Sequence, residues 1–596
     1  MKSIINKFLI GASAVALAGF TSCTGDLDQL PQDPNQVNVS DFAKDPKGYL
    51  GGAMAKCYSG LAVASQEGQS GACDISGVDG GMSQWSRAIF YLEDMSTDLC
   101  LWIWPDEGVP ELVYNTWDSN NKYAYSAFSR FYFHIAVCND FLRLARNAGD
   151  YGISLDAEMQ KELKQFTLEA RALRGITYYY VIDLFGRSTV AWDDLPYGET
   201  PPQAESRAAL YEKVVADLEE VEREFPEGEP VMGRIGKDAV QALLCKFYLN
   251  AEVYIGENRY SDCEKVAQDI IDGTYGTYAV ADRWDAAFDW DNDRCDEVIF
   301  GFPSSQGYSY WLYQGDTYWW TVPARARYYF NDSKAKGGDH NTKYAASPSY
   351  DLDGNLYTYE LGMPIQNFRK YPGDERMKLY RNLGDSKREG MFLFGYLEYI
   401  DENGKKARVR APEQPYDLYI RDAVGNFQAL APDKWPSNKT SNLRNGDHNS
   451  GWHFAKYPFY SDDDAHQMES DYTEIRLPEI IYSLAECKLR AGNKTEAAKL
   501  LNSVRKRNYP AENYDEVLYS PEGKAFLDES ELLAEWGREF FAESRRRVDL
   551  IRFGKFSSGT WWDKTPDADK NTEIFPIMRP ILNANPNLVQ NPGYNK

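Results

Sequence analysis

The sequence predicts a mainly α-helical protein in which a tetratricopeptide-like helical-repeat scaffold carries a large loop-rich, irregular region. Two observations lead to this prediction. Apolar residues recur at helical spacing in two separated stretches, and one helical hairpin pattern occurs in both of them. The intervening residues 273–475 contain many Gly, Pro, Asp and aromatic residues but only short apolar runs, such as Val298–Phe302. Because disordered segments are poor in aromatic residues, we expect ordered loops there, and loops commonly carry function.

The first 22 residues have the features of a secretory signal peptide. Lys2 and Lys7 precede an uncharged apolar run of 13 residues, Phe8–Phe20. A helix needs about 20 apolar residues to cross a membrane, so this run directs export and does not anchor the chain.

The residues Gly19-Phe20-Thr21-Ser22-Cys23 resemble a bacterial lipobox, in which the signal is removed before the Cys and the thiol is acylated. Acyl chains contribute about 0.8 kcal/mol per buried methylene, so they attach a chain to a membrane without a spanning helix. An ordinary secretory signal is the alternative. We predict a signal peptide over residues 1–22, lipidation at Cys23, a polar tether over 23–41 and a single folded domain over 42–596.

The N-terminal helical part of that domain, residues 42–272, contains three predicted helices. Lys161–Phe185 has an apolar stripe, and the Gly186 that follows it is a stop signal. Gly236–Ile255 and Tyr260–Ile271 form a predicted helix pair that ends before Gly273.

The C-terminal helical part, residues 476–596, contains three more predicted helices: Leu477–Ala491, Lys494–Arg507 and Asp528–Ser544. Laying Tyr248–Ile271 over Tyr482–Arg505 without a gap pairs Tyr with Tyr at the start and Ala251 with Ala485. Small residues between bulky apolar ones allow the close helix crossings of tetratricopeptide repeats. A generic antiparallel helix pair is the alternative.

Charge and cysteine content restrict the partners and the chemistry. The net charge of −25 at pH 7 repels phosphate backbones, so nucleic acid is not an expected ligand, whereas a neutral ligand would hardly be affected. Export permits disulfides. However, Cys245 and Cys263 fall in predicted packed helices, where free buried thiols are as plausible as a bridge.

A search for catalytic and metal-binding motifs finds none. The five histidines have no zinc-site spacing, and the chain has neither a Gly-x-Ser-x-Gly elbow nor a phosphate-binding loop of the Walker type. Asp289, Asp291 and Asp293 alternate as calcium ligands do, but Arg294 and Phe300 replace the Gly and Glu of an EF-hand. We therefore expect solvated acidic loops, no metal and no cofactor, and calcium binding stays an alternative.

Several motifs in a fixed order carry a resemblance to a known family. They are Glu169-Ala-Arg171 to Gly186, Gly233 to Leu244, Ile475-Arg476-Leu-Pro478-Glu479 with Ala485-Glu486, Leu501 to Arg507, Asp549 to Lys555, and Asn585 to Tyr594. In these motifs, which extend over nearly the whole mature chain, the sequence resembles the SusD/RagB family. The departures, at Trp536-Gly537, Ser544–Arg547 and Met578–Pro580, fall on packing and capping positions.

The resemblance implies four tetratricopeptide-like helix pairs in a protein that is lipid-anchored on the outer face of the outer membrane. It also implies a partner, a TonB-dependent (SusC-like) outer-membrane transporter, to which the protein delivers a captured oligosaccharide or polysaccharide without acting as an enzyme. A peptide ligand on the same architecture and a surface glycoside hydrolase are the alternatives.

Aromatic residues are the expected binding groups, because flat rings cover the C–H faces of sugars. The chain has 15 Trp, 42 Tyr and 28 Phe, and two clusters lie in predicted loops. The predicted glycan-binding rings are Trp102, Trp104, Trp117, Trp311, Tyr313, Tyr318, Trp319 and Trp320, with Asp98, Asn115 and Asp118 as hydrogen-bonding partners. The alternative is that these rings pack onto the scaffold, since Trp is usually largely buried.

Overall fold

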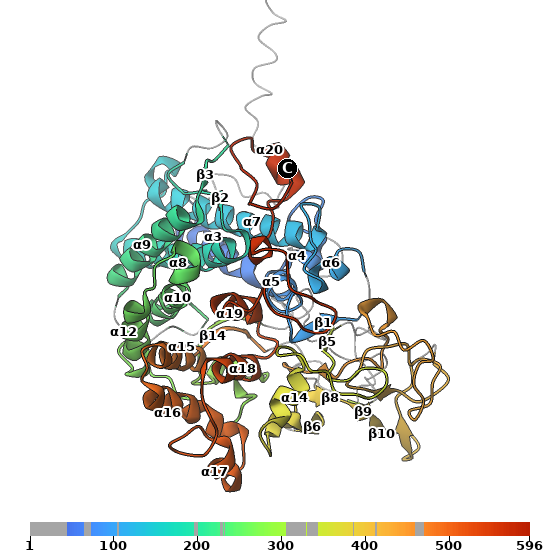
Figure 1. Cartoon of the computed structure of the whole chain (residues 1–596). Coiled ribbons are helices and arrows are strands. Elements are labelled where there is room, and N and C mark those ends of the chain that lie inside the picture. Colours follow the sequence, from blue (N-terminus) through green and yellow to red (C-terminus); the bar gives the residue numbers. More distant parts are fainter. Residues whose placement is uncertain are drawn as a thin grey trace, which may run out of the picture.

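The structure is a computed structural model. It describes residues 44–64, 73–103, 106–195, 201–226, 231, 233–304, 329–330, 344–384, 387–411, 414–458 and 470–595. Helices form most of its regular structure, and the strands of the described part form two-stranded ladders (Figure 1). The predicted mainly α-helical class is confirmed. The predicted signal peptide, lipidation site and tether lie outside the described residues.

The N-terminal part consists of helices that pack on one another. They are α3 (Pro46–Ala62), α4 (Gly80–Ser83), α5 (Trp85–Glu93), α6 (Val109–Val113), α7 (Lys122–Arg146), α8 (Ala157–Phe185) and α9 (Arg207–Glu224). The predicted helix Lys161–Phe185 is confirmed as α8. It begins earlier than predicted because the Asp156 carboxylate accepts a hydrogen bond from Met159 N at 2.8 Å and caps the first turn.

The predicted helix Gly236–Ile255 is divided into α10 (Lys237–Leu249) and α11 (Ala251–Ile255). Asn250 separates the two helices, with φ −98° and ψ 6°. Its amide nitrogen donates to Lys246 O at 2.9 Å, and its amide oxygen accepts from Arg552 Nη1 at 2.9 Å. Because the Asn250 side chain makes hydrogen bonds to both Lys246 and Arg552, the chain can turn here inside an otherwise continuous apolar pattern.

The repeated hairpin is formed by α10–α12, with α12 at Tyr260–Ile271, and by α15 (Leu477–Arg490) with α16 (Lys494–Arg505). Helices α12 and α15 pack directly on each other, so the two hairpins are neighbours in one stack (Figure 1). The small residues Ala251, Cys263, Ala485 and Ala497 are all fully buried. The predicted tetratricopeptide-like packing is confirmed. Cys245 and Cys263 are free thiols with their Sγ atoms 3.5 Å apart.

The C-terminal part continues with α17 (Tyr514–Val517), α18 (Glu529–Glu539), α19 (Arg546–Arg552) and α20 (Arg579–Ala584). Helix α18 ends before the predicted Ser544. Ala542 and Ser544 adopt positive φ values of 59° and 58°, which no helix accommodates. Ser544 N instead donates to the buried Asp94 carboxylate at 2.9 Å, so a tertiary contact ends the helix.

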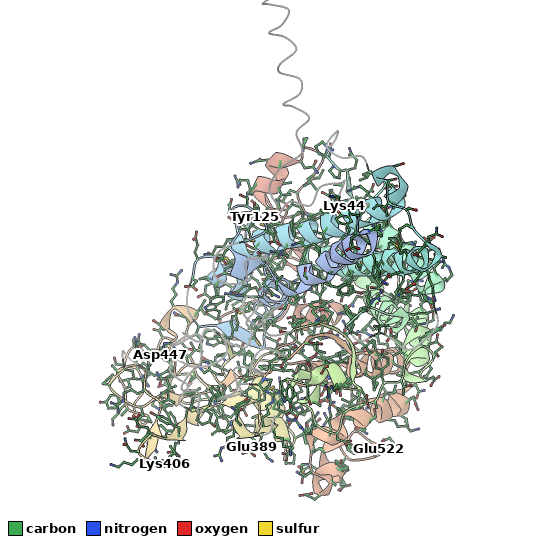
Figure 2. The ribbon with its side chains drawn as sticks, turned by 180° about the vertical axis from the view of Figure 1, so that it is seen from behind. Lys44, Tyr125, Glu389, Lys406, Asp447 and Glu522 are labelled. Atoms are coloured by element: carbon green, nitrogen blue, oxygen red, sulfur yellow. The ribbon has the colours of Figure 1, made fainter. Side chains whose placement is uncertain are left out.

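The segment between the two hairpins forms a lobe of loops and short ladders. Its elements are β4 (Val298–Phe302), β5 (Tyr344–Ala346), α14 (Pro364–Arg369), β6 (Arg381–Gly384), β7 (Lys387–Glu389), β8 (Phe392–Leu393), β9 (Gly395–Tyr396), β10 (Glu398–Ile400), β11 (Lys406–Arg408), β12 (Tyr419–Ile420), β13 (His453–Phe454) and β14 (Tyr472–Arg476). Lys406, on the β10–β11 hairpin, lies far from Lys44, where the described chain begins (Figure 2).

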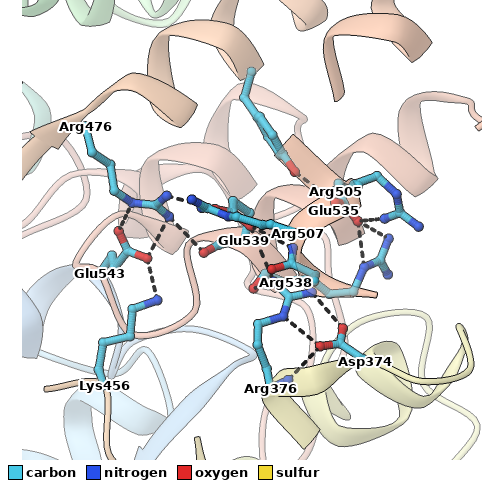
Figure 3. Close-up of polar contacts among 12 residues, drawn as sticks. Asp374, Arg376, Lys456, Arg476, Arg505, Arg507, Glu535, Arg538, Glu539 and Glu543 are labelled. Carbon is cyan, nitrogen blue, oxygen red and sulfur yellow. Dashed lines mark hydrogen bonds and ion pairs between the residues drawn. The ribbon is translucent and has the colours of Figure 1, made fainter. Parts of the chain in front are cut away.

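A buried charge network joins the lobe to the C-terminal helices (Figure 3). Arg476, at the end of β14, is 2% exposed. Its guanidinium contacts Glu539 at 2.8 Å, Glu297 at 3.0 Å and Glu543 at 2.8 Å. The ammonium of Lys456 reaches the same Glu543 at 2.5 Å. One arginine therefore connects β14 with the end of α18 and the segment before β4.

Glu539 is the anionic centre of this network. Burial alone would raise the pKa of its carboxyl, but Arg507, Arg476 and Arg376 hold that pKa well below its usual range. Arg507 lies 2.5 Å from the carboxylate, and Arg376 lies 3.4 Å away while also pairing with Asp374 at 2.7 Å. The lobe thus contributes a cation to a carboxylate of the helical scaffold.

We expect Arg476→Met to lower the free energy of unfolding by about 3–5 kcal/mol, because the buried Glu297 and Glu539 and the partly buried Glu543 lose their shared cation. Urea unfolding of the protein measures this loss. The matched control is Arg294→Met at a side chain that is 80% exposed, where a change within about 0.5 kcal/mol is expected. Equal stability of the two variants would contradict a structural role for the network.

Candidate ligand-binding region

The strand that precedes the predicted Trp104 site is paired and buried. β1 (Cys100–Trp102) runs antiparallel to β5, with Trp102 opposite Tyr344. The Trp102 ring is 2% exposed, stacks on Tyr91 at 5.2 Å and meets the edge of Tyr344 at 5.2 Å. This ring belongs to the core in this structure, so it offers no face to a ligand. It fixes the strand from which residues 104–105 continue.

Trp117 is also a packing residue, with 4% of its side chain exposed. Its ring stacks on Phe575 at 4.3 Å, and its Nε1–H donates to the Tyr594 hydroxyl at 2.9 Å. The ring therefore joins the N-terminal part to the last residues of the chain. Trp102 and Trp117 therefore both pack onto the scaffold, which was the alternative to a binding role.

The predicted polar partners have separate positions. Asp98 is buried and accepts hydrogen bonds from Arg546 at 2.7 and 2.9 Å and from Gly362 N at 3.0 Å. The Asn115 amide, at a left-handed φ of 55°, donates to the carbonyl oxygens of Leu112 and Ser96 at 3.0 Å each. Asp118 is exposed and accepts from Asn120 N at 2.8 Å, which closes a local turn. Asp98 and Asn115 thus maintain the fold around β1 and are not free for a ligand.

The remaining predicted rings, Trp104, Trp311, Tyr313, Tyr318, Trp319 and Trp320, lie outside the described residues. The structure fixes the residues from which their segments continue. Ser304 N donates to the Asp471 carboxylate at 2.8 Å, and Phe330 is 2% exposed and packs against Tyr380. The flanking residues Ser304 and Phe330 are therefore held against the described part of the protein.

Two open clefts in the described part were not predicted. One, of about 590 Å³, lies beside α7, α8 and α9, and its Trp192 ring is covered by Arg174 at 3.8 Å. The other, of about 520 Å³, lies between α14 and α18 and includes Asp98 and the exposed Phe526. Each is assembled from segments distant in the sequence, so no local motif signals it.

Asp289, one of the acidic residues considered for calcium, is paired with a cation of the protein. Asp289 is 3% exposed and pairs with Arg283 at 2.9 Å. Within the described ranges, no group of His, Cys, Asp and Glu side chains is arranged to hold a metal ion. Of the helices that the structure describes, none combines the length and the apolar character needed to cross a membrane.

Comparison with known proteins agrees with this architecture. The model of the SusD family matches residues 311–594. The chain is 26% identical, over an alignment of 633 positions that covers all of both chains, to the starch-binding protein SusD of Bacteroides thetaiotaomicron. The chain is therefore similar to the SusD family, by a family-model match in its C-terminal half and by similarity along its full length to one relative.

Solved structures show the same fold. B. fragilis NanU superposes with a TM-score of 0.65 at 16% identity, over 95% of this chain and 100% of that chain. The surface glycan-binding protein A from Bacteroides uniformis has a TM-score of 0.60 at 16% identity, over 91% of this chain and 99% of that one. These identities are low, so they establish the fold alone.

We expect Trp102→Ala to lower the free energy of unfolding by about 3–5 kcal/mol, because it leaves a cavity between Tyr91 and Tyr344. Thermal and urea unfolding measure the loss. Asp118→Ala is the control nearby, and it should stay within about 0.5 kcal/mol of the parent protein. A Trp102→Ala variant of unchanged stability would contradict the packing role of this ring.

Proposed function

We propose that this protein is a cell-surface glycan-binding lipoprotein that captures oligosaccharides and delivers them to a SusC-like, TonB-dependent outer-membrane transporter. The observation that carries the proposal is the similarity along both full chains to a relative named as a starch-binding protein. A structural neighbour, surface glycan-binding protein A, is also named for glycan binding.

The residue chemistry supports a sugar ligand. Segment 305–328 contains five of the predicted aromatic residues close to one another in sequence: Trp311, Tyr313, Tyr318, Trp319 and Trp320. Segment 104–105 adds Trp104. Rings stack on sugars without the desolvation cost that a charged group would incur. The acidic chain hardly affects a neutral glycan, but it disfavours polyanions.

Binding without catalysis is part of the proposal. No catalytic motif occurs in the sequence, and the buried carboxylates around Glu539 and Asp98 are committed to arginines. The glycoside hydrolase alternative makes a different prediction, since it requires a product to be released from the bound glycan. Chromatography of the glycan after incubation with the protein distinguishes binding without catalysis from glycoside hydrolysis.

We expect Trp104→Ala, and separately the double variant Trp319→Ala with Trp320→Ala, to weaken glycan binding while thermal stability changes little. Stacking by an exposed ring contributes roughly 1–3 kcal/mol, by analogy with ring stacking on bases. A glycan array on the lipid-free domain identifies the ligand, and calorimetry then measures the affinities.

Leu383→Ala, at an exposed apolar side chain of β6, is the matched control and should bind normally. Loss of several degrees in melting temperature together with normal binding would assign these rings to the core. A wild-type domain that binds peptides but no glycan on such arrays would favour the peptide-binding alternative.

We expect Cys23→Ser to release the protein from the membrane fraction, because the acyl chains would be its only strong attachment. The measurement is fractionation of cells that lack the partner transporter, so that protein contacts cannot retain the variant. Cys57→Ser, at a fully buried thiol of α3, is the control and should remain in the membrane fraction. Retention of the Cys23→Ser protein would contradict the lipid anchor.

A further inference from the structure

The cleft between α14 and α18 has the volume of a small-molecule site. Its volume is about 520 Å³, within the range of small-molecule sites. The two helices that border it pack against each other below β1 (Figure 1).

The floor of this cleft is rigid. Asp98 and Arg546 form a buried ion pair there, with contacts of 2.7 and 2.9 Å. Asn367 Nδ2 donates to Gly362 O at 3.1 Å, and Gly362 N donates to Asp98 at 3.0 Å. These contacts hold the segment before α14 against β1 and define the floor of the cleft.

The rim offers both donors and acceptors to solvent. Lys555 Nζ and Glu360 form an ion pair at 2.7 Å, with side chains that are 36% and 65% exposed. The Lys370 side chain is 53% exposed, and Asp528 is exposed at the start of α18. Exposed ion pairs contribute only about 0–1 kcal/mol, so hydroxyl groups of a ligand can replace such contacts at small cost.

Phe526 holds an aromatic ring at the same rim. It is 66% exposed, more than any other large apolar side chain in the described part of the chain. Its neighbours Ala525 and Leu527 are 7% and 1% exposed, and Ala525 N donates to Leu518 O at 3.0 Å, so the backbone is fixed. Lys494 Nζ lies 3.8 Å from the ring centroid. The ring is therefore positioned and still accessible.

The charge of the cleft selects among ligands. Five carboxylates line it, from Asp98, Glu360, Glu516, Asp528 and Glu531, against three cations, from Lys370, Lys555 and Arg546. The surplus of negative charge disfavours uronates and sulfated sugars. A neutral ligand with many hydroxyls and an apolar face fits the donors, acceptors and ring that are present.

We propose that this cleft is a second glycan-binding site, which binds a neutral oligosaccharide with one sugar face on Phe526 and hydroxyls on Glu360 and Lys555. The proposal rests on the proposed function, because it assigns the same class of ligand to a separate place. Two sites on one chain would increase the avidity for a polysaccharide without any new contact at the first site.

The test is calorimetric titration of the lipid-free domain with maltohexaose, cellohexaose, xylohexaose and mannohexaose, with an oligogalacturonide as the anionic counterpart. For a neutral glycan that binds, we expect Phe526→Ala to weaken one class of sites roughly tenfold or more. The variant with Trp104, Trp319 and Trp320 all changed to Ala should retain that class of sites. Phe526→Tyr should preserve it, because the ring remains.

The matched control is Leu383→Ala, at a side chain that is 59% exposed and does not line the cleft. Melting temperatures of all variants verify the fold. If the wild type binds a glycan and Phe526→Ala binds it equally well, the second site is contradicted while the proposed function stands. If the wild type binds none of these oligosaccharides and nothing on the glycan array, both proposals are contradicted. Preferential binding of the oligogalacturonide in the cleft would contradict the charge argument.

Discussion

The arrangement of this protein depends on the buried ion pairs between Arg476 and its three glutamates. Arg476 stands where the lobe ends and the C-terminal hairpin begins, and Glu539 stands at the end of α18. Burying such charges is costly unless each is paired, so the folded protein requires all the partners of the network. Asp98 and Arg546 form a similar buried pair next to β1. The mutual position of scaffold and lobe is therefore specified by charge geometry as well as by apolar packing.

The helices of the scaffold were predictable because their determinants are local. The apolar stripe of α8 and the Gly186 after it set its C-terminal end, and the repeated small residues of the two hairpins set their packing. The errors arose where a distant partner decided the outcome. Arg552 binds Asn250 and divides α10 from α11, and Asp94 binds Ser544 N beyond the end of α18. Neither contact leaves a signal within the segment that it alters.

The candidate site was less predictable, for a related reason. Aromatic content identifies rings but not their exposure, so Trp102 and Trp117 look in sequence like binding residues although only 2% and 4% of their side chains are exposed. Likewise, Asp98 looks like a free hydrogen-bonding group until Arg546, far along the chain, is placed beside it. Phe526 is the reverse case: an isolated Phe near the start of a helix resembles a core residue in the sequence, but the structure exposes it. Exposure depends on tertiary neighbours, which periodicity does not specify.

The β4–β14 ladder has a consequence for how the chain can change over time. Val298 and Arg476 pair across it, so the lobe begins and ends at neighbouring positions of the scaffold. Helices α12 and α15, which flank the lobe in the sequence, pack directly on each other. The entropy of closing a long insertion grows only slowly with its length. Most of the lobe can therefore be lengthened, shortened or exchanged between relatives while the helical stack is retained. The lobe is thus an insertion whose length and sequence can change independently of the helical stack.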